Sequence, residues 1–348
     1  MRYSVLSALA AALLWVALTL LALPVGQAAA EPASAQAPGP ETEANEPALD
    51  PAAAVFADAV FDTNCQLAVL TQDGVRTMDL QHYLTGVLLA EMPVSFGEEA
   101  LKAQAVACRT YTLGRCQNSR HPEAAVCTDP HCCQGWTDPA EADPDARELA
   151  EAAVKATDGL VLQYDGTLID ATFFSCSGGR TEDAAAVWGS DLPYLRAVAS
   201  PGEEDAAHFT DELQLPLEDF CAALEGLDDK IHFSDDPGTW LESVQYTAGG
   251  GVGQAVLCGH SFSGTALRKA FGLRSTAFSL SLDGGGAIFT TRGNGHRVGM
   301  SQYGAAAMAQ AGNDFETILK WYYQGVDLAQ AELPCASSLA GISCPDGA

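Results

Sequence analysis

Basic residues are scarce in this chain, and their scarcity limits the partners that it can bind. The 348 residues include 17 Lys and Arg against 45 Asp and Glu, which gives a formal net charge of -28 at pH 7. Such a chain repels the phosphates of nucleic acids, so we exclude DNA and RNA as partners. A substrate is therefore expected to be neutral, or to be met by a local cluster of Arg and Lys.

The sequence also lacks an internal repeat and a second hydrophobic run long enough to span a membrane. The first such run starts near Arg2, continues to Val25 and is followed by three alanines. This pattern predicts that residues 1–30 are either a cleaved signal peptide or an uncleaved N-terminal membrane anchor. Both alternatives export the rest of the chain. Residues 31–58, rich in Ala, Pro and Glu, are expected to form a disordered tether.

Helical and strand patterns alternate through the rest of the chain, which predicts an α+β fold of mixed short strands and helices. Asp-Gly pairs at 73–74 and 165–166 predict the turns of two hairpins. A first helix is expected to end before Pro93. A capping box formed by Ser95 and Glu98 is expected to open a second helix over residues 98–115.

Glu91 is the leading candidate for a catalytic group. Leu80, Leu84, Val87 and Glu91 recur at helical spacing, so the carboxyl lies on the apolar face of the first helix, in its last turn. Burial and the negative end of the helix dipole both disfavour the ionised form there. Such a carboxylic acid can donate a proton near neutral pH. The alternative is a partly exposed Glu at a fraying helix end.

The second predicted helix carries three polar residues that we consider as substrate-binding groups. A forked guanidinium at Arg109 suits a substrate oxygen or carboxylate, and Lys102 and Gln104 could line the same cleft. The alternative for Arg109 is a structural salt bridge.

The chain has eleven cysteines, and two of them combine with a histidine in a pattern that favours a metal. His121, Cys127 and Cys133 are spaced six positions apart on an expected loop, and imidazole with thiolates suits Zn²⁺. Further candidate ligands nearby are Cys116, His131 and Cys132. The alternative is a disulfide such as Cys116–Cys127, because the spacing does not match paired CxxC motifs.

Two glycine-rich turns form a third group of candidates. In Gly293-NGHRVGMSQYG the candidate substrate-binding residues are His296, Ser301, Gln302 and Tyr303. The motif contains G-x-G but not G-x-G-x-x-G, so it does not indicate a dinucleotide site. The turn that begins Ser175-CSGGR adds Ser177, and Cys176 could be read as a nucleophile with His296 as its base. Packing in a turn is the alternative for Cys176.

Several of these segments, taken together and in order, resemble the SpoIID/LytB family. The matching segments lie between residues 61 and 328 and are Tyr83-LTGVLLAEMPVSFGEEALKAQAVACRTYTL, Phe174-SCSGGRTEDAAAVWGSDLPYLRAV, Ser263-GTALRKAFGLRSTAF, Gly293-NGHRVGMSQYGAAAMAQAG and Ile318-LKWYYQGV. The resemblance implies a catalytic domain over residues 59–330 with a central cleft.

The resemblance also implies a function. It implies a peptidoglycan lytic transglycosylase of spore-forming bacteria, which cleaves between N-acetylmuramic acid and N-acetylglucosamine in glycan strands stripped of stem peptides by a partner amidase. The family's catalytic glutamate falls on Glu91 and its RTY arginine on Arg109. Some members bind zinc through a His and two Cys spaced like His121, Cys127 and Cys133. The LytB branch implies the alternative of a non-enzymatic amidase enhancer.

The chain departs from the family pattern at a few positions. Arg297 stands where members usually have glycine, and it is expected either to add a charge at the cleft or to alter the turn. Residues 331–348 form a tail without a family counterpart, in which Cys335 and Cys344 are either a disulfide or two thiols.

Overall fold

The computed structural model describes residues 61–331 and 342–343. The expected leader over residues 1–30, the expected tether over 31–58, and Cys335 and Cys344 of the tail lie outside the described residues. None of the described helices is both long enough and apolar enough to cross a bilayer.

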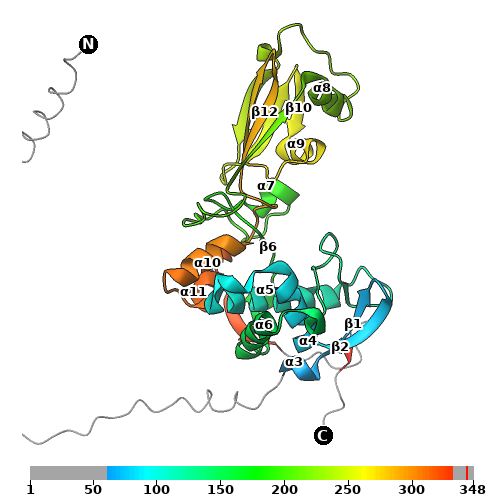
Figure 1. Cartoon of the computed structure of the whole chain (residues 1–348), viewed down its shortest axis with the longest axis vertical. Coiled ribbons are helices and arrows are strands. Elements are labelled where there is room, and N and C mark those ends of the chain that lie inside the picture. Colours follow the sequence, from blue (N-terminus) through cyan, green and yellow to red (C-terminus); the bar gives the residue numbers. More distant parts are fainter. Residues whose placement is uncertain (1–60, 332–341, 344–348) are drawn as a thin grey trace, which may run out of the picture. The chain divides into compact units, whose positions relative to one another are not determined.

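The predicted α+β class is confirmed, because helices combine with several small sheets (Figure 1). The described helices are α3 (Phe61–Asn64), α4 (Leu80–Glu91), α5 (Glu98–Gln117), α6 (Pro144–Ala156), α7 (Ala184–Trp188), α8 (Leu217–Glu225), α9 (Gly264–Phe271), α10 (Gln302–Gln310) and α11 (Phe315–Tyr322), with short 3₁₀ turns at η2 (Val94–Phe96), η3 (Pro139–Glu141) and η4 (Pro237–Thr239).

The strands pair mostly as local antiparallel ribbons. One sheet has the order β15-β1-β2 with β3 parallel to β1, and the others have the orders β14-β4-β5, β10-β9-β8, β11-β12-β7 and β13-β6. Their bounds are β1 (Gln66–Thr71), β2 (Gly74–Asp79), β3 (Val126–Cys127), β4 (Leu160–Tyr164), β5 (Thr167–Leu168), β6 (Phe173–Phe174), β7 (Thr210–Leu215), β8 (Leu241–Tyr246), β9 (Val252–Leu257), β10 (His260–Ser263), β11 (Phe278–Asp283), β12 (Gly286–Arg292), β13 (Met300–Ser301), β14 (Asp327–Gln330) and β15 (Ile342–Ser343).

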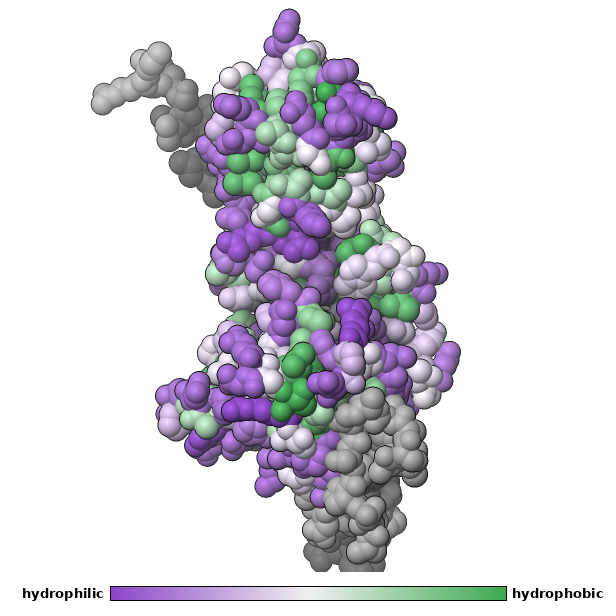
Figure 2. All heavy atoms as spheres, turned by 90° about the vertical axis from the view of Figure 1, so that its right-hand side faces the viewer, coloured by the Kyte–Doolittle hydropathy of each residue, from purple (hydrophilic) through white to green (hydrophobic). Residues whose placement is uncertain are grey.

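Two hydrophobic cores hold these elements together. The first includes buried residues of α4, α5, α6 and α11, with Leu67 and Val69 of β1. The second is built from α8, α9 and strands β7–β12, around the rings of Phe220, Phe271 and Phe289. Hydrophilic residues predominate over the face drawn in Figure 2, as the acidic composition leads one to expect.

The beginning and end of α4 follow from local sequence. The side chain of Asp79 caps the helix by accepting a hydrogen bond from the backbone N–H of His82 at 2.7 Å. Met92 takes an extended conformation ahead of Pro93, so the helix ends at Glu91 as expected. The predicted capping box is wrong: Ser95 lies in η2, and α5 starts after Gly97 without a side-chain cap.

Candidate active site

Glu91 lies at the carboxyl end of α4, beside a cleft. Leu80, Leu84 and Val87 on the same face are fully buried, and the Glu91 side chain is partly buried, which confirms the predicted apolar face. The cleft has a volume of about 670 Å³. Its lining comes from α4, α5, the loop 130–134, residues 170–175, α7 with the residues after it, and the turn 294–296.

Two hydrogen bonds fix Glu91 at this place. The backbone N–H of Gly135 donates to Oε1 at 2.6 Å, and Nε2 of Gln302 donates to the backbone carbonyl of Glu91 at 2.9 Å. Burial raises the pKa of the Glu91 carboxyl, and the Gly135 hydrogen bond opposes that rise. The direction agrees with the sequence-based expectation. Since Oε1 accepts the N–H of Gly135, Oε2 is the oxygen left to carry the proton.

The loop that supplies Gly135 packs directly on α4. A Cβ added at Gly86 would lie 2.1 Å from the indole nitrogen of Trp136, so only glycine allows this close approach. The loop is also bonded to α5, because the Thr112 hydroxyl donates a hydrogen bond to Oε1 of the loop residue Gln134 at 2.9 Å. These contacts set the position of the N–H that holds Glu91.

Arg109 lies in the hydrophobic core and not in the cleft. Its side chain is fully buried, forms an ion pair with Asp62 of α3, and donates at 3.2 Å to the backbone carbonyls of Val154 and Leu160. A guanidinium with its donors occupied in this way cannot reach a substrate beside Glu91. This finding corrects the substrate-binding prediction and favours the alternative, a structural salt bridge.

The other two candidates on α5 are also placed away from the cleft lining. Gln104 is fully buried and donates to the sulfur of Cys108 at 3.3 Å. Lys102 pairs with Glu98 at 2.5 Å and with Glu99 at 2.9 Å along its own helix. The structure therefore corrects the expectation that either residue lines the cleft.

His296 is the predicted substrate-binding residue that does line the cleft. Its ring lies 5.1 Å from the ring of Trp188 and 5.5 Å from that of Phe174. Burial, reinforced by the charge of Arg268, lowers the pKa of His296 to about 4, so the imidazole is neutral at pH 7. Its Nδ1 accepts the backbone N–H of Val298 at 3.1 Å, which orients the ring.

The remaining candidates of the glycine-rich turns bind the protein itself. Ser301 caps α10 by accepting from the N–H of Gly304 at 3.2 Å, and Tyr303 packs its ring 4.8 Å from that of Phe96. Ser177 is fully buried and donates to Glu203 at 2.9 Å. Ser177 and Ser301 are fully buried, which corrects their predicted contact with substrate. Tyr303 is partly exposed outside this cleft, and its contact with substrate stays a prediction. Gln302 acts on the site through the backbone of Glu91.

Arg297 lies in the turn and does not line the cleft, so it adds no charge there. Its φ of 65° lies in the left-handed region that favours glycine. The buried guanidinium pairs with Glu182 at 3.3 Å and donates to the carbonyls of Ser177 at 2.8 Å and Gly249 at 2.8 Å. These bonds join the turn to two other loops, which offsets the cost of a side chain in this conformation.

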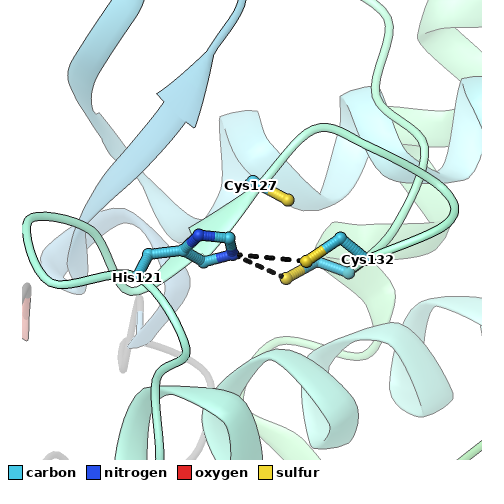
Figure 3. A group of neighbouring side chains, drawn as sticks. His121, Cys127 and Cys132 are labelled. Carbon is cyan, nitrogen blue, oxygen red and sulfur yellow. Dashed lines mark hydrogen bonds between the residues drawn. The ribbon is translucent and has the colours of Figure 1, made fainter.

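A cluster of four potential metal ligands lies on the loop before Gly135. The ligand atoms of His121, Cys127, Cys132 and Cys133 all lie within 4.8 Å of one another. Nε2 of His121 is 3.4 Å from Sγ of Cys133 and 3.6 Å from Sγ of Cys132, and Figure 3 shows the imidazole pointing toward the sulfurs. The three predicted ligands are thus together, and Cys132 completes a Cys₃His set typical of closed structural zinc sites.

The alternatives that invoked other cysteine chemistry are not supported. Neither Cys116 nor Cys127 forms a disulfide among the described residues, so the Cys116–Cys127 bond is absent there. The thiol of Cys176 is 3.1 Å from the carboxylate of Glu203, and burial raises the pKa of Cys176 to about 12. A thiol held protonated beside a carboxylate is a poor nucleophile, so the reading of Cys176 with His296 as its base is wrong.

Sequence reasoning missed Gly135, Trp188 and Arg120. Gly135 and Trp188 lie in ordinary local sequence, and only the tertiary fold brings them to Glu91 and to the cleft. Arg120 directly precedes the candidate ligand His121, and no sequence pattern around it predicts that its side chain lines the cleft.

Comparison with known proteins identifies the family of this chain. The profile of the family described as Stage II sporulation protein matches residues 71–164, the segment that contains Glu91 and the Cys₃His cluster. The chain is 36% identical to stage II sporulation protein D of Bacillus amyloliquefaciens over 268 residues, which cover 74% of this chain and 76% of that protein. It is 35% identical to stage II sporulation protein D of Bacillus subtilis (strain 168) over 269 residues, with the same coverage.

A more distant relative carries a different name. The chain is 29% identical over 298 residues to the amidase enhancer of Bacillus subtilis (strain 168), which corresponds to 70% of this chain but 40% of that protein. The fold is α+β, and the family profile and the two relatives of higher identity are named for sporulation. The chain belongs to the stage II sporulation protein D (SpoIID) family.

Proposed function

We propose that this protein is a peptidoglycan lytic transglycosylase that cleaves peptide-free glycan strands between N-acetylmuramic acid and N-acetylglucosamine during sporulation. The observation that carries the proposal is Glu91, a carboxyl that faces a cleft and whose pKa is raised by burial. A non-catalytic binding module has no need of an acid in that setting. The protein is exported, attached by its N-terminal segment or released, and it works beside a cell-wall amidase.

In the proposed mechanism, Glu91 first acts as an acid. Its Oε2 proton moves to the glycosidic oxygen as that bond breaks and the sugar develops oxocarbenium character. The ionised Glu91 then takes the proton of the C6 hydroxyl of the same sugar, whose oxygen closes a 1,6-anhydro ring. No water enters the bond-breaking step.

The carboxylates around the cleft are consistent with this single-acid mechanism. Asp170 is the other carboxylate that lines the cleft within the described residues, and it lies 3.5 Å from the guanidinium of Arg115. This ion pair engages the Asp170 carboxylate with a side chain of the protein itself. A hydrolase would require a base for activating water in addition to the acid.

The products of cleavage test the proposal. We expect mass spectrometry of peptide-free glycan strands, incubated with the protein, to show fragments that end in 1,6-anhydro sugar. Fragments that end in a reducing sugar would assign a hydrolase. Absence of cleavage, with stimulation of a cell-wall amidase in the same reaction, would assign the enhancer function that one relative's name suggests.

Trp188 is expected to provide an apolar platform for a sugar ring. Its side chain lines the cleft and is 42% exposed, so the indole ring is accessible to a ligand there. Replacing Trp188 with Ala is expected to raise KM by about 2- to 10-fold with a smaller effect on kcat, since aromatic contacts contribute about 0.5–1.5 kcal/mol. Trp321→Ala is the control, because Trp321 is 43% exposed but outside the cleft lining. Equal KM values for the two variants would remove Trp188 from the site.

We also propose that His121, Cys127, Cys132 and Cys133 hold a structural zinc ion. Zinc at this cluster would fix the loop that runs to Gly135 and would leave no position open for water. Loss of a residue that only hydrogen-bonds to a metal ligand typically weakens metal affinity by about 10- to 100-fold. Cys132→Ser removes a ligand itself, so it is expected to weaken zinc affinity by more than that. Metal analysis after dialysis against a chelator measures this, with Cys221→Ser as a control outside the cluster. Unchanged retention would exclude Cys132 as a ligand.

A further inference from the structure

Arg120 is an exposed cation at the cleft. It is exposed, it lines the cleft together with Glu91, and its guanidinium has no hydrogen bond or ion pair within the part of the chain that the structure describes. The other guanidinium of the cleft differs, because Arg115 lies 3.5 Å from Asp170 and 4.7 Å from the centre of the Tyr111 ring. In a chain of net charge -28, Arg120 thus presents to the cleft a guanidinium that no carboxylate of the described residues pairs with, and its electrostatic neighbour is the thiol of Cys132.

The backbone that carries Arg120 is held in place. The hydroxyl of Ser119 accepts the N–H of His121 at 3.0 Å and donates to the carbonyl of Ala124 at 2.7 Å. Pro130, His131 and Cys132 line the same cleft as Arg120. The guanidinium breaks no internal hydrogen bond when it binds an anion, so the cost is that of ordering its own side chain.

The glycan that the proposed function requires offers one anion at the right place. Each N-acetylmuramic acid carries a lactyl group, which is an amide while a stem peptide is attached and a free carboxylate once the peptide is removed. The rest of the sugar backbone is neutral. A guanidinium binds a carboxylate through two parallel hydrogen bonds, and it has no comparable interaction with an amide.

We propose that Arg120 binds the free lactyl carboxylate of N-acetylmuramic acid and so selects glycan from which the stem peptide has been removed. This inference rests on the proposed function and adds the residue that sets substrate preference. Selection by charge makes the product of the amidase reaction the preferred substrate of this cleft.

Binding measured without cleavage tests the inference. The full chain carrying Glu91→Gln is titrated by calorimetry with peptide-free glycan oligomers, and with the same oligomers after conversion of their carboxylates to methylamides. We expect the carboxylate form to bind roughly 10- to 100-fold more tightly, as for hydrogen bonds to a charged group. Adding Arg120→Gln should remove this difference by weakening only the carboxylate form, and Arg120→Lys should restore part of it.

The controls separate this inference from the function on which it rests. Arg147→Gln removes the same charge from α6, outside the cleft, and should leave both affinities unchanged. Zinc content and melting temperature show whether Arg120→Gln disturbs the neighbouring His121. If the Glu91→Gln protein binds both oligomers equally, or if Arg120→Gln keeps the preference, the role of Arg120 is overturned while glycan binding stands. If neither oligomer binds, the proposed function itself fails.

Discussion

Replacing Glu91 with Gln is expected to lower the rate of glycan cleavage by about 100- to 10,000-fold, the usual contribution of a general acid. The amide has nearly the same shape as the carboxyl, and its oxygen can still accept the N–H of Gly135. The fold and the binding of glycan should therefore be preserved while the proton is lost. Initial rates of formation of anhydro-ended fragments measure the effect.

A matched substitution distinguishes loss of the acid from loss of any carboxylate. Glu98→Gln changes an exposed residue of α5 that pairs with Lys102, outside the cleft lining, and it should keep the wild-type rate. Full activity in the Glu91→Gln protein would remove Glu91 from the mechanism. The wild-type rate should also fall as pH rises through the raised pKa of Glu91, since only the protonated form donates.

The same raised pKa implies a cost in stability. Below the ordinary pKa of Glu, about 4.3, the carboxyl is protonated in the folded and unfolded chains alike and has no effect. Above it, the unfolded chain ionises more readily, so wild-type stability falls as pH rises through the folded-state pKa. Glu91→Gln should therefore raise the melting temperature at pH 7 relative to wild type, but not at pH 4. Equal shifts at both pH values would contradict burial as the cause.

The elements of this fold that depend on neighbouring residues were predictable from the sequence. The buried face ending in Glu91, the end of α4 before Pro93 and the hairpin turn at 73–74 each depend on a few adjacent positions. The metal candidates His121, Cys127 and Cys133 follow from spacing within one loop. Even so, the local capping signal at Ser95 failed, because the backbone there forms η2.

Features that depend on distant pairs could not be predicted. The partner of Arg109 is Asp62, 47 positions earlier, and the N–H that holds Glu91 comes from Gly135, 44 positions later. Periodicity places Arg109 on a helix, but it cannot tell whether an acid meets it in the core. The resemblance identified both Glu91 and Arg109 as family positions, and the structure separates the one at the cleft from the one that supports the fold.

Arg109→Met is expected to lower the free energy of unfolding by about 3–5 kcal/mol, as is typical when one partner of a buried ion pair is removed. Asp62 would then be buried without its counter-ion, and the carbonyls of Val154 and Leu160 would lose their donor. Urea denaturation measures the change. A residue that binds substrate would instead raise KM while leaving the unfolding midpoint nearly constant.

A double variant separates the two roles of Arg109 further. Asp62→Leu combined with Arg109→Met removes both charges, so it should recover a large part of the stability that the single variant loses. Because neither residue lines the cleft, the double variant should also cleave glycan with a KM close to that of wild type at temperatures where it is folded. A stable double variant with strongly raised KM would return Arg109 to the substrate-binding site. Recovery of stability and activity together would establish that this arginine serves the catalytic acid only by holding α3 and α5 to the core beside α4.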